Sequence, residues 1–197
     1  MSVGRPREFD IDRALDQALR VFWEKGYEGA TLPELTRAMG INRPSLYAAF
    51  GNKETLFRKA VERYEEGPAR YTAQALAEST SRKVVERLWA EGIELVTNGR
   101  NPRGCFAVQA ALVCGDEAQS VRDELARRRK SGELQLRKRL QKAKAEGDLP
   151  TDANVADLAR YAVTVLHGMA VQAASGATKR ELQHVARTAI KAWPTKR

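Results

Sequence analysis

The amino-acid sequence predicts an all-α protein in which a small helical head precedes a larger helical body. Apolar residues recur at helical spacing in nearly every segment, and no segment alternates apolar and polar residues long enough to suggest a strand. Short turn sequences such as GNK, NGRNPRG and EGDLPTD separate the segments. The helices are expected to be short and tightly capped in the head, residues 1–52, and longer in the body, residues 53–197, as in a helix bundle.

The head is predicted to contain three helices, and the first two have clear end signals. The first begins after Asp10, a suitable N-cap, and stops at Gly26. The second lies in TLPELTRAMG, where Thr31 and Glu34 have the spacing of a capping box and the final glycine ends the helix. Both helices are therefore expected to have sharply defined ends.

The third helix, expected at residues 43–50, is too short to be stable alone, because isolated helices below about 12 residues are marginal in water. Asn42 is its N-cap, and Gly40 and Ile41 complete the turn that joins it to the second helix. A DNA major groove accepts one helix, and only its N-terminal residues reach base edges. A recognition helix would explain the short length, although the same helix-turn-helix also occurs in plain helical packing.

Several residues near this helix are candidates for contacting DNA. Arg43, Pro44 and Ser45 occupy its N-terminal end. Tyr47 can direct its hydroxyl to a phosphate, or it can be a core residue with an exposed tip. Lys53 begins the next helix, where its charge and the free backbone N–H groups suit an anion.

Two further regions of the head suit the DNA backbone or the minor groove. Thr31 stands at the start of the second helix, where the backbone again favours an anion. Arg5 and Arg7, held extended by Pro6, suit a narrow A·T-rich minor groove. The alternative for this arm is a disordered terminus.

The body is predicted to consist mainly of long helices. One is expected from Lys53 towards Tyr71, and the others are expected near residues 81–97, 103–113, 117–146, 152–174 and 178–193. The helix at 152–174 carries an apolar stripe of Val155, Leu158, Ala162, Val165, Met169 and Ala173. Because two long apolar helices at the end of the chain exceed what a small bundle needs, we expect them to pair two copies, with internal core as the alternative.

Composition excludes several classes of protein. The formal net charge of +9 favours an anionic partner, with nucleic acid first and an acidic membrane surface second. We find no signal peptide or spanning segment, and two cysteines are too few for a disulfide scaffold, so we expect a cytoplasmic protein. Only two histidines and no clustered cysteines leave a metal site without ligands, and nucleotide-binding and hydrolase motifs are missing. We therefore expect no cofactor, no metal and no enzyme activity.

The stretch FDIDRALDQALRVFWEKGYEGATLPELTRAMGINRPSLYAAFGNKETLF, residues 9–57, resembles the DNA-binding domain of TetR-type bacterial transcriptional regulators. The resemblance implies a three-helix DNA-binding head, a helical ligand-binding body, a homodimer formed by the last two helices, and release of an operator when a small molecule binds. By position it implies DNA contacts from Thr31, Arg43, Pro44, Ser45, Tyr47 and Lys53. The commonest version of the motif has a second aromatic residue where this chain has Ala48-Ala49.

The body also contains the ingredients of a small-molecule site. Apolar walls with few polar groups are typical of such pockets, and the candidates are Trp89, Cys105, Phe106, Gln109, Leu112, Tyr161 and His167. Cys105 follows Arg103 at a predicted helix N-terminus, which would favour its thiolate. Some regulators that resemble this segment use such a cysteine to sense electrophiles; the alternative is a buried core thiol, which Cys114 resembles more clearly.

We therefore predict a ligand-responsive, DNA-binding transcriptional regulator, a repressor released from a palindromic operator by a small molecule or an electrophile. Its expected partners are double-stranded operator DNA, a small-molecule effector and a second copy of the chain, without a membrane. One alternative is a helical small-molecule-binding or adaptor protein that does not bind DNA, which salt-dependent binding to a palindromic duplex would discriminate. Another is a helical enzyme that modifies a small molecule, which turnover without DNA affinity would reveal.

Overall fold

The computed structural model describes residues 9–112 and 118–195, without the side chains of residues 111 and 112. Arg5, Arg7 and Cys114 therefore lie outside the described residues. Within them the chain contains helices and turns and no β-strand, which confirms the all-α prediction. The helices are α1 (Ile11–Gly29), α2 (Leu32–Met39), α3 (Arg43–Phe50), α4 (Lys53–Glu66), α5 (Tyr71–Leu76), α6 (Ser81–Thr97), α7 (Phe106–Leu112), α8 (Gln119–Ala145), α9 (Val155–Ala174) and α10 (Lys179–Ala189), followed by a 3₁₀ turn at Ile190–Ala192.

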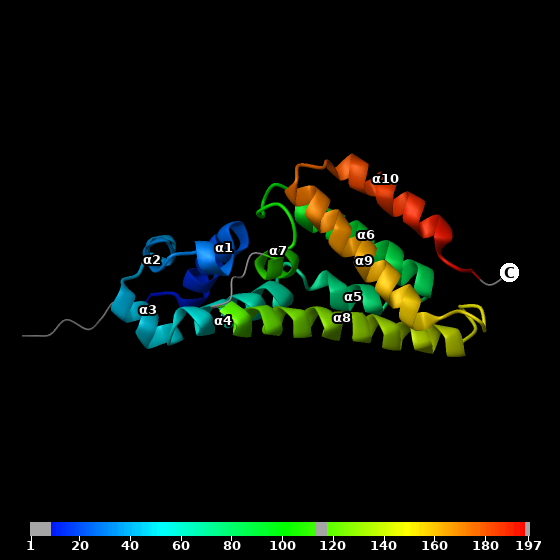
Figure 1. The fold of residues 1–197 in the computed structure, drawn as a ribbon, viewed down its shortest axis with the longest axis horizontal. Coiled ribbons are helices and arrows are strands. Elements are labelled where there is room, and N and C mark those ends of the chain that lie inside the picture. Colours follow the sequence, from blue (N-terminus) through cyan, green and yellow to red (C-terminus); the bar gives the residue numbers. More distant parts are fainter. Residues whose placement is uncertain (1–8, 113–117, 196–197) are drawn as a thin grey trace, which may run out of the picture.

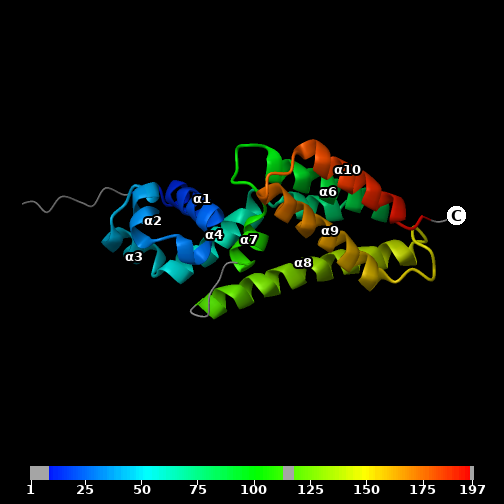
Figure 2. The same ribbon diagram turned by 45° about the horizontal axis from the view of Figure 1, so that its top comes forward.

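The helices are arranged along one long axis. Figure 1 shows α1, α2 and α3 at one end and α6, α9 and α10 at the other, with α8 running along the lower edge. Figure 2, turned by 45°, keeps α7 between these two groups. None of the helices in the described ranges is both long and apolar enough to span a membrane.

The helix ends of the head follow the local signals in the sequence. Gly26 interrupts α1 with φ of 71° and ψ of −178°, a backbone that favours glycine. At α2 the Thr31 side chain accepts from the Glu34 N–H, and the Glu34 carboxylate accepts from the Thr31 N–H, so the predicted capping box is confirmed. Asn42 caps α3 through its side chain, which accepts from the Ser45 N–H at 2.8 Å.

The prediction of one helix from Lys53 towards Tyr71 is wrong. α4 ends at Glu66, and α5 begins only at Tyr71. Between them Gly67 has φ of −105° and ψ of −100°, outside the helical region. Pro68 follows, and a proline disfavours helical backbone at the residue before it. The Gly67-Pro68 pair was therefore a visible stop signal.

Buried apolar side chains form two clusters. The first joins the head to α4, α7 and the start of α8, and the second fills the space between α6, α8, α9 and α10. Leu56, Phe57 and Val61 of α4 belong to the first cluster, so α4 packs as part of the head's core, and the domain boundary at residues 52 and 53 stays a prediction. Tyr71 and Cys105 pack against both clusters.

The apolar stripe of α9 lies mostly inside the chain's own core. Val155, Ala162, Met169 and Ala173 are buried in the second cluster, as the internal-core alternative predicted. The exposed apolar side chains of this region lie on the flanking surface, where Val171 in α9 is 40% exposed and Val185 in α10 is 46% exposed.

Candidate nucleic-acid interface and buried cavity

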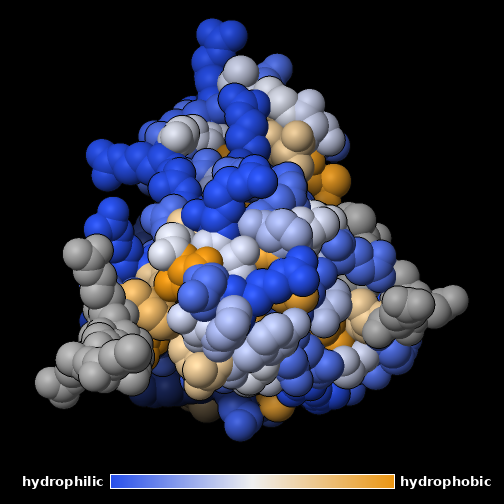
Figure 3. Space-filling model, turned by 90° about the vertical axis from the view of Figure 1, so that its left-hand side faces the viewer, coloured by the Kyte–Doolittle hydropathy of each residue, from blue (hydrophilic) through white to orange (hydrophobic). Residues whose placement is uncertain are grey.

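The N-terminal end of α3 is presented at the surface of the head. Leu46 and Phe50 are buried on one side of α3 and fix its orientation. The opposite side leaves Arg43 and Pro44 exposed, and Tyr47 is 47% exposed. Figure 3 views the molecule from this end and shows a mostly hydrophilic surface with scattered apolar side chains. An exposed arginine and tyrosine at the start of a short, capped helix can reach a groove and its phosphates.

Lys53 lies beside this surface and is held in place by the end of α1. Its ammonium group lies 4.6 Å from the centroid of the Tyr27 ring and donates to the Glu28 carbonyl at 3.5 Å. Partial burial lowers the pKa of Lys53, and Glu28 opposes that shift. Because these contacts position its ammonium group, Lys53 presents a charge at a defined place next to the first turn of α4.

The Thr31 side chain makes hydrogen bonds within the head. Its hydroxyl donates to the Glu34 carboxylate at 2.8 Å, as part of the capping box. Hydrogen bonds from Lys25 and then from Thr31 lower the pKa of Glu34 to about 2. An ionised carboxylate therefore accepts hydrogen bonds from Thr31 at this helix start, and contact of Thr31 with DNA stays a prediction.

A cavity of about 180 Å³ lies in the body between α4, α5, α6, α8 and α9. Most of its walls are apolar, including Leu76, Leu88, Leu95, Val96, Leu136 and Leu166. The head-proximal wall comes from α4 through Tyr64 and Glu65, so the cavity touches the helix that packs against α1.

Polar groups gather at the end of the cavity nearest α4. The Tyr64 hydroxyl lies 3.2 Å from the Cys105 sulfur. Burial raises the pKa of both Tyr64 and Tyr71, and Cys105 adds to both shifts. Both phenols therefore remain protonated at neutral pH, when they can donate hydrogen bonds.

The charged groups of the cavity wall already have partners. Arg128 pairs with Glu65 and with Glu124, the second at 2.7 Å. Arg129 donates to the Ala107 carbonyl at 2.9 Å, and Glu133 pairs with Arg160 at 3.2 Å. The wall consequently offers no unpaired charge from these residues.

Of the residues predicted for a ligand site, Cys105 and His167 line this cavity. Trp89 and Phe106 are instead buried core residues, and the Trp89 indole donates to the Ala162 carbonyl at 3.0 Å. The Tyr161 hydroxyl donates to the Ala189 carbonyl at 2.9 Å.

The Gln109 side chain packs closely against Gly104 in the loop before α7. A Cβ atom added at Gly104 would lie 2.7 Å from the Gln109 side chain. Leu112 has no described side chain. The sequence did not identify Tyr64, Tyr71 or Gly92 as cavity residues. Only Gly92 carried a local signal, because a glycine inside a predicted helix suggests a packing reason.

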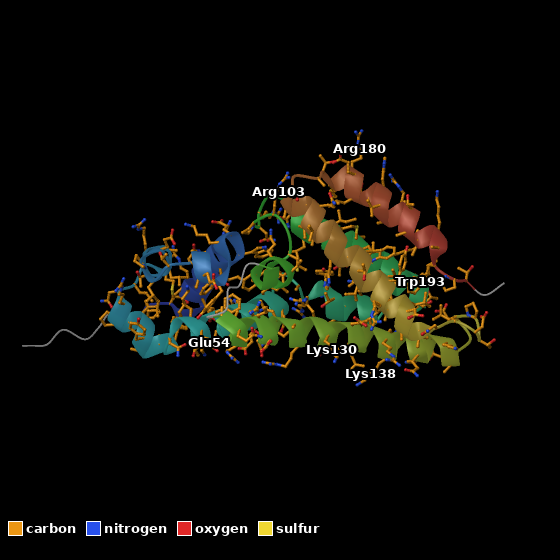
Figure 4. All side chains as sticks on the ribbon, viewed as in Figure 1. Glu54, Arg103, Lys130, Lys138, Arg180 and Trp193 are labelled. Carbon is orange, nitrogen blue, oxygen red and sulfur yellow. The ribbon has the colours of Figure 1, made fainter. Side chains whose placement is uncertain are left out.

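Cys105 stands at the N-terminus of α7, as expected, where its carbonyl accepts from the Gln109 N–H at 2.9 Å. α7 begins at Phe106 and has seven residues, so Cys105 precedes a very short helix. Arg103 is exposed, and Figure 4 places it on the loop before α7. The group that contacts the thiol is the Tyr64 hydroxyl, at 3.2 Å.

The loop that carries Cys105 also contacts the head. The Trp23 indole of α1 donates to the Gly104 carbonyl at 3.0 Å. The Trp23 ring meets the Tyr64 ring edge to face, with centroids 4.9 Å apart. One loop and one aromatic pair therefore connect the cavity wall to α1.

His167 should make the protein less stable in mild acid. Burial and then Arg129 lower the pKa of His167, while Glu133 opposes the shift. The unfolded chain then binds the proton more readily, so stability is complete above about pH 6.5 and falls below it, by at most about 1.4 kcal/mol per pH unit. Denaturant unfolding at several pH values from 7.5 to 5 would measure this. The free energy of unfolding of the wild type should fall with pH more steeply than that of His167→Gln. A difference between the two free energies of unfolding that stays constant over this pH range would contradict the prediction.

Comparisons with known proteins agree with this arrangement. Residues 14–60 match the family model of bacterial regulatory proteins of the tetR family, and residues 82–189 match the tetracyclin repressor-like C-terminal domain. The HTH-type transcriptional repressor ComR of Escherichia coli K12 is 33% identical over 195 residues, which is 98% of this chain and 93% of ComR.

Two solved structures show the same fold at high identity. A cysteine mutant of the TetR family regulator CifR, complexed with 26-base-pair operator DNA, is 43% identical with a TM-score of 0.93, over 96% of this chain and 100% of CifR. A second CifR mutant with one more cysteine replaced, also complexed with 26-base-pair operator DNA, has the same identity and TM-score over 97% and 100%.

Proposed function

Because this chain belongs to the TetR family of bacterial regulatory proteins, we propose that it is a DNA-binding transcriptional repressor that a small molecule or an electrophile releases from a palindromic operator. The observation that supports this proposal most is the exposed N-terminal end of α3 in a helix-turn-helix. Its relative CifR, as a cysteine mutant, is complexed with operator DNA. Such a protein is a regulator rather than an enzyme, and it acts in the bacterial cytoplasm.

In this proposal α3 enters the major groove. Arg43 reaches base edges, with Pro44 and Ser45 beside it at the helix start. Tyr47 and Lys53 contact phosphates on either side, and the exposure of Tyr47 and the position of Lys53 at the start of α4 support that role. The preceding arm, which carries Arg5 and Arg7, follows the minor groove.

Binding of the purified protein to upstream DNA tests the proposal. Affinity for a palindromic segment should exceed that for a scrambled duplex, and its logarithm should fall linearly with the logarithm of salt concentration. A protein without this preference at any salt concentration would instead be the non-DNA-binding adaptor.

Substitutions at Arg43 and Lys53 should have different signatures. Arg43→Ala should weaken operator binding by about 1–3 kcal/mol and relax base preference at one position. Lys53→Ala should weaken all duplexes alike and reduce the salt slope by about one, because a phosphate contact carries no sequence information. Fluorescence anisotropy at several salt concentrations would measure both effects.

Lys138→Ala provides the matched control. Figure 4 places Lys138 on α8, far from α3, and its substitution removes the same charge as Lys53→Ala. Its operator affinity should stay close to wild type. Unchanged affinity in both Arg43→Ala and Lys53→Ala would remove α3 from the interface.

We propose that the exposed faces of α9 and α10 pair two copies of the chain. Val171 and Val185 are exposed apolar side chains on these adjacent helices. A hollow between the helices is lined by Gly168 and the half-buried Val165. A two-fold dimer would set its two recognition helices about 34–36 Å apart, one DNA turn, which a palindromic operator requires.

The effector acts through the cavity that touches α4. To release DNA, it must bind the DNA-incompetent arrangement more tightly, since equal affinity for both arrangements shifts nothing. α4 supplies both the cavity wall and part of the head's core. A ligand that displaces Tyr64 would therefore also move the packing of Trp23 in α1.

Cys105→Ser separates the covalent mechanism from the non-covalent one. CifR mutants with several cysteines replaced are complexed with operator DNA, so we expect Cys105→Ser to keep operator affinity within about threefold of wild type. If Cys105 is the sensor, N-ethylmaleimide should release operator from wild type and leave the variant bound. Equal release from both proteins would exclude Cys105 and favour non-covalent binding.

A further inference from the structure

We propose that the cavity takes a small neutral molecule with a hydrogen-bond-accepting oxygen, such as a ketone, an aldehyde or an ether, and that the Tyr71 hydroxyl binds this oxygen. The inference rests on the proposed function only in treating occupancy of this cavity as the signal. Its basis is the size and the charge of the site and the position of the Tyr71 hydroxyl at its wall.

The volume of the cavity limits the ligand to a small molecule. Pockets for drug-sized ligands are on the order of 300–1,000 Å³, and this cavity is about 180 Å³. An apolar protein cavity of about 150 Å³ is known to hold benzene. The site therefore fits one six-membered ring, or a short chain of similar volume.

The charges of the wall favour a neutral ligand. Two acidic residues, Glu65 and Glu133, balance two basic residues, Arg128 and Arg129. Each makes an ion pair or hydrogen bond with another residue. His167 has a lowered pKa and is neutral at pH 7. An anion or a cation would have to leave water without gaining a new counter-ion, which is unfavourable.

Tyr71 supplies the donor for the ligand. No hydrogen bond among the described residues uses its hydroxyl, whereas the Tyr64 hydroxyl is already paired with Cys105. Burial keeps Tyr71 protonated, so the free group is a donor. Tyr71 lines the cavity and its hydroxyl lies beside Gly92, so an oxygen of a bound ligand can accept its hydrogen bond.

Gly92 keeps the space around this hydroxyl open. It lies in the middle of α6, where glycine is a poor helix former and so suggests a packing reason. A Cβ at this position would come within 2.5 Å of the Leu166 Cδ1 atom and within 3.2 Å of the Tyr71 hydroxyl oxygen. Leu166 and Tyr71 both line the cavity, so a side chain at position 92 would displace atoms of its wall.

Matched ligands test the donor directly. Calorimetry on the full chain without DNA would compare cyclohexanone with methylenecyclohexane, which has a similar shape and no oxygen. Tyr71→Phe should weaken cyclohexanone binding by about 3- to 10-fold and change methylenecyclohexane binding by less than about twofold. Equal changes for both ligands would overturn the role of Tyr71.

Three further measurements complete the test. Tyr161→Phe removes a hydroxyl that is bonded to Ala189, and it should leave the discrimination between the ligands unchanged. Gly92→Ala should weaken both ligands at least about tenfold, because the added methyl group displaces Leu166 and the Tyr71 hydroxyl at the cavity wall; wild-type affinity in this variant would overturn the assignment of the cavity. Cyclohexanecarboxylate should bind at least about tenfold more weakly than cyclohexanone, and equal affinity would overturn the preference for a neutral ligand.

Failure of this inference is distinguishable from failure of the proposed function. The ligand measurements need no DNA, and operator binding is measured separately. A protein that binds cyclohexanone through Tyr71 and never binds operator contradicts the repressor proposal alone. A protein that binds operator, and that binds methylenecyclohexane and cyclohexanecarboxylate as tightly as cyclohexanone, contradicts only the proposed ligand class.

Discussion

A Val185→Arg variant should sediment as a monomer and should bind a palindromic operator at least about 100-fold more weakly than wild type. Val185 is 46% exposed in the single chain, on the face of α10 that we propose to be covered by a second copy. Pairing would bury an arginine without a counter-charge, at a cost of several kcal/mol per ion. Operator binding then suffers because each monomer can occupy only one half-site.

Leu134→Arg is the matched control for this variant. Leu134 is also an exposed apolar residue, 48% exposed, and it lies on α8, outside the proposed interface. Sedimentation should find this variant dimeric, with operator affinity near that of wild type. A dimeric Val185→Arg protein would show that α10 does not form the interface.

Replacing Phe106 by alanine should lower the free energy of unfolding by about 3–5 kcal/mol. The ring is fully buried and lies where the head meets the body. Its centroid lies 5.4 Å from that of Phe57 and 5.5 Å from that of Tyr64. Deleting the ring would leave a hole between rigid aromatic neighbours that cannot collapse fully.

Denaturant unfolding would measure this loss, and Tyr47→Ala provides the contrast. Tyr47 is 47% exposed, so truncating this aromatic side chain should change stability by no more than about 0.5 kcal/mol. A loss below about 1 kcal/mol in Phe106→Ala would mean that the junction between head and body repacks easily.

The sequence alone was sufficient for the parts of this protein that depend on neighbours in the chain. The N-cap at Asn42 and the capping box of Thr31 and Glu34 act across three residues, so their side chains and spacing specify the helix ends. The same holds for the exposed start of α3. Asn42 fixes Arg43 as the first residue of the helix, and the helical spacing from the buried Leu46 places Arg43 on an exposed side. Even the missed break at Gly67 was a local signal.

Only the tertiary structure decided which residues form the cavity. Tyr71, Gly92 and Cys105 come from α5, α6 and the loop before α7, and periodicity along one helix does not report which of these side chains meet. Trp89 and Phe106 have the apolar character of pocket residues, and the fold placed them in its core.

The stripe of α9 shows the same physical limit. An apolar face at helical spacing must be covered, and the spacing is identical whether the covering surface belongs to the same chain or to a second copy. Packing against the chain's own helices buried Met169 and left Val171 exposed. Local interactions therefore determined where helices start and stop, while long-range packing determined which faces became core, cavity or surface.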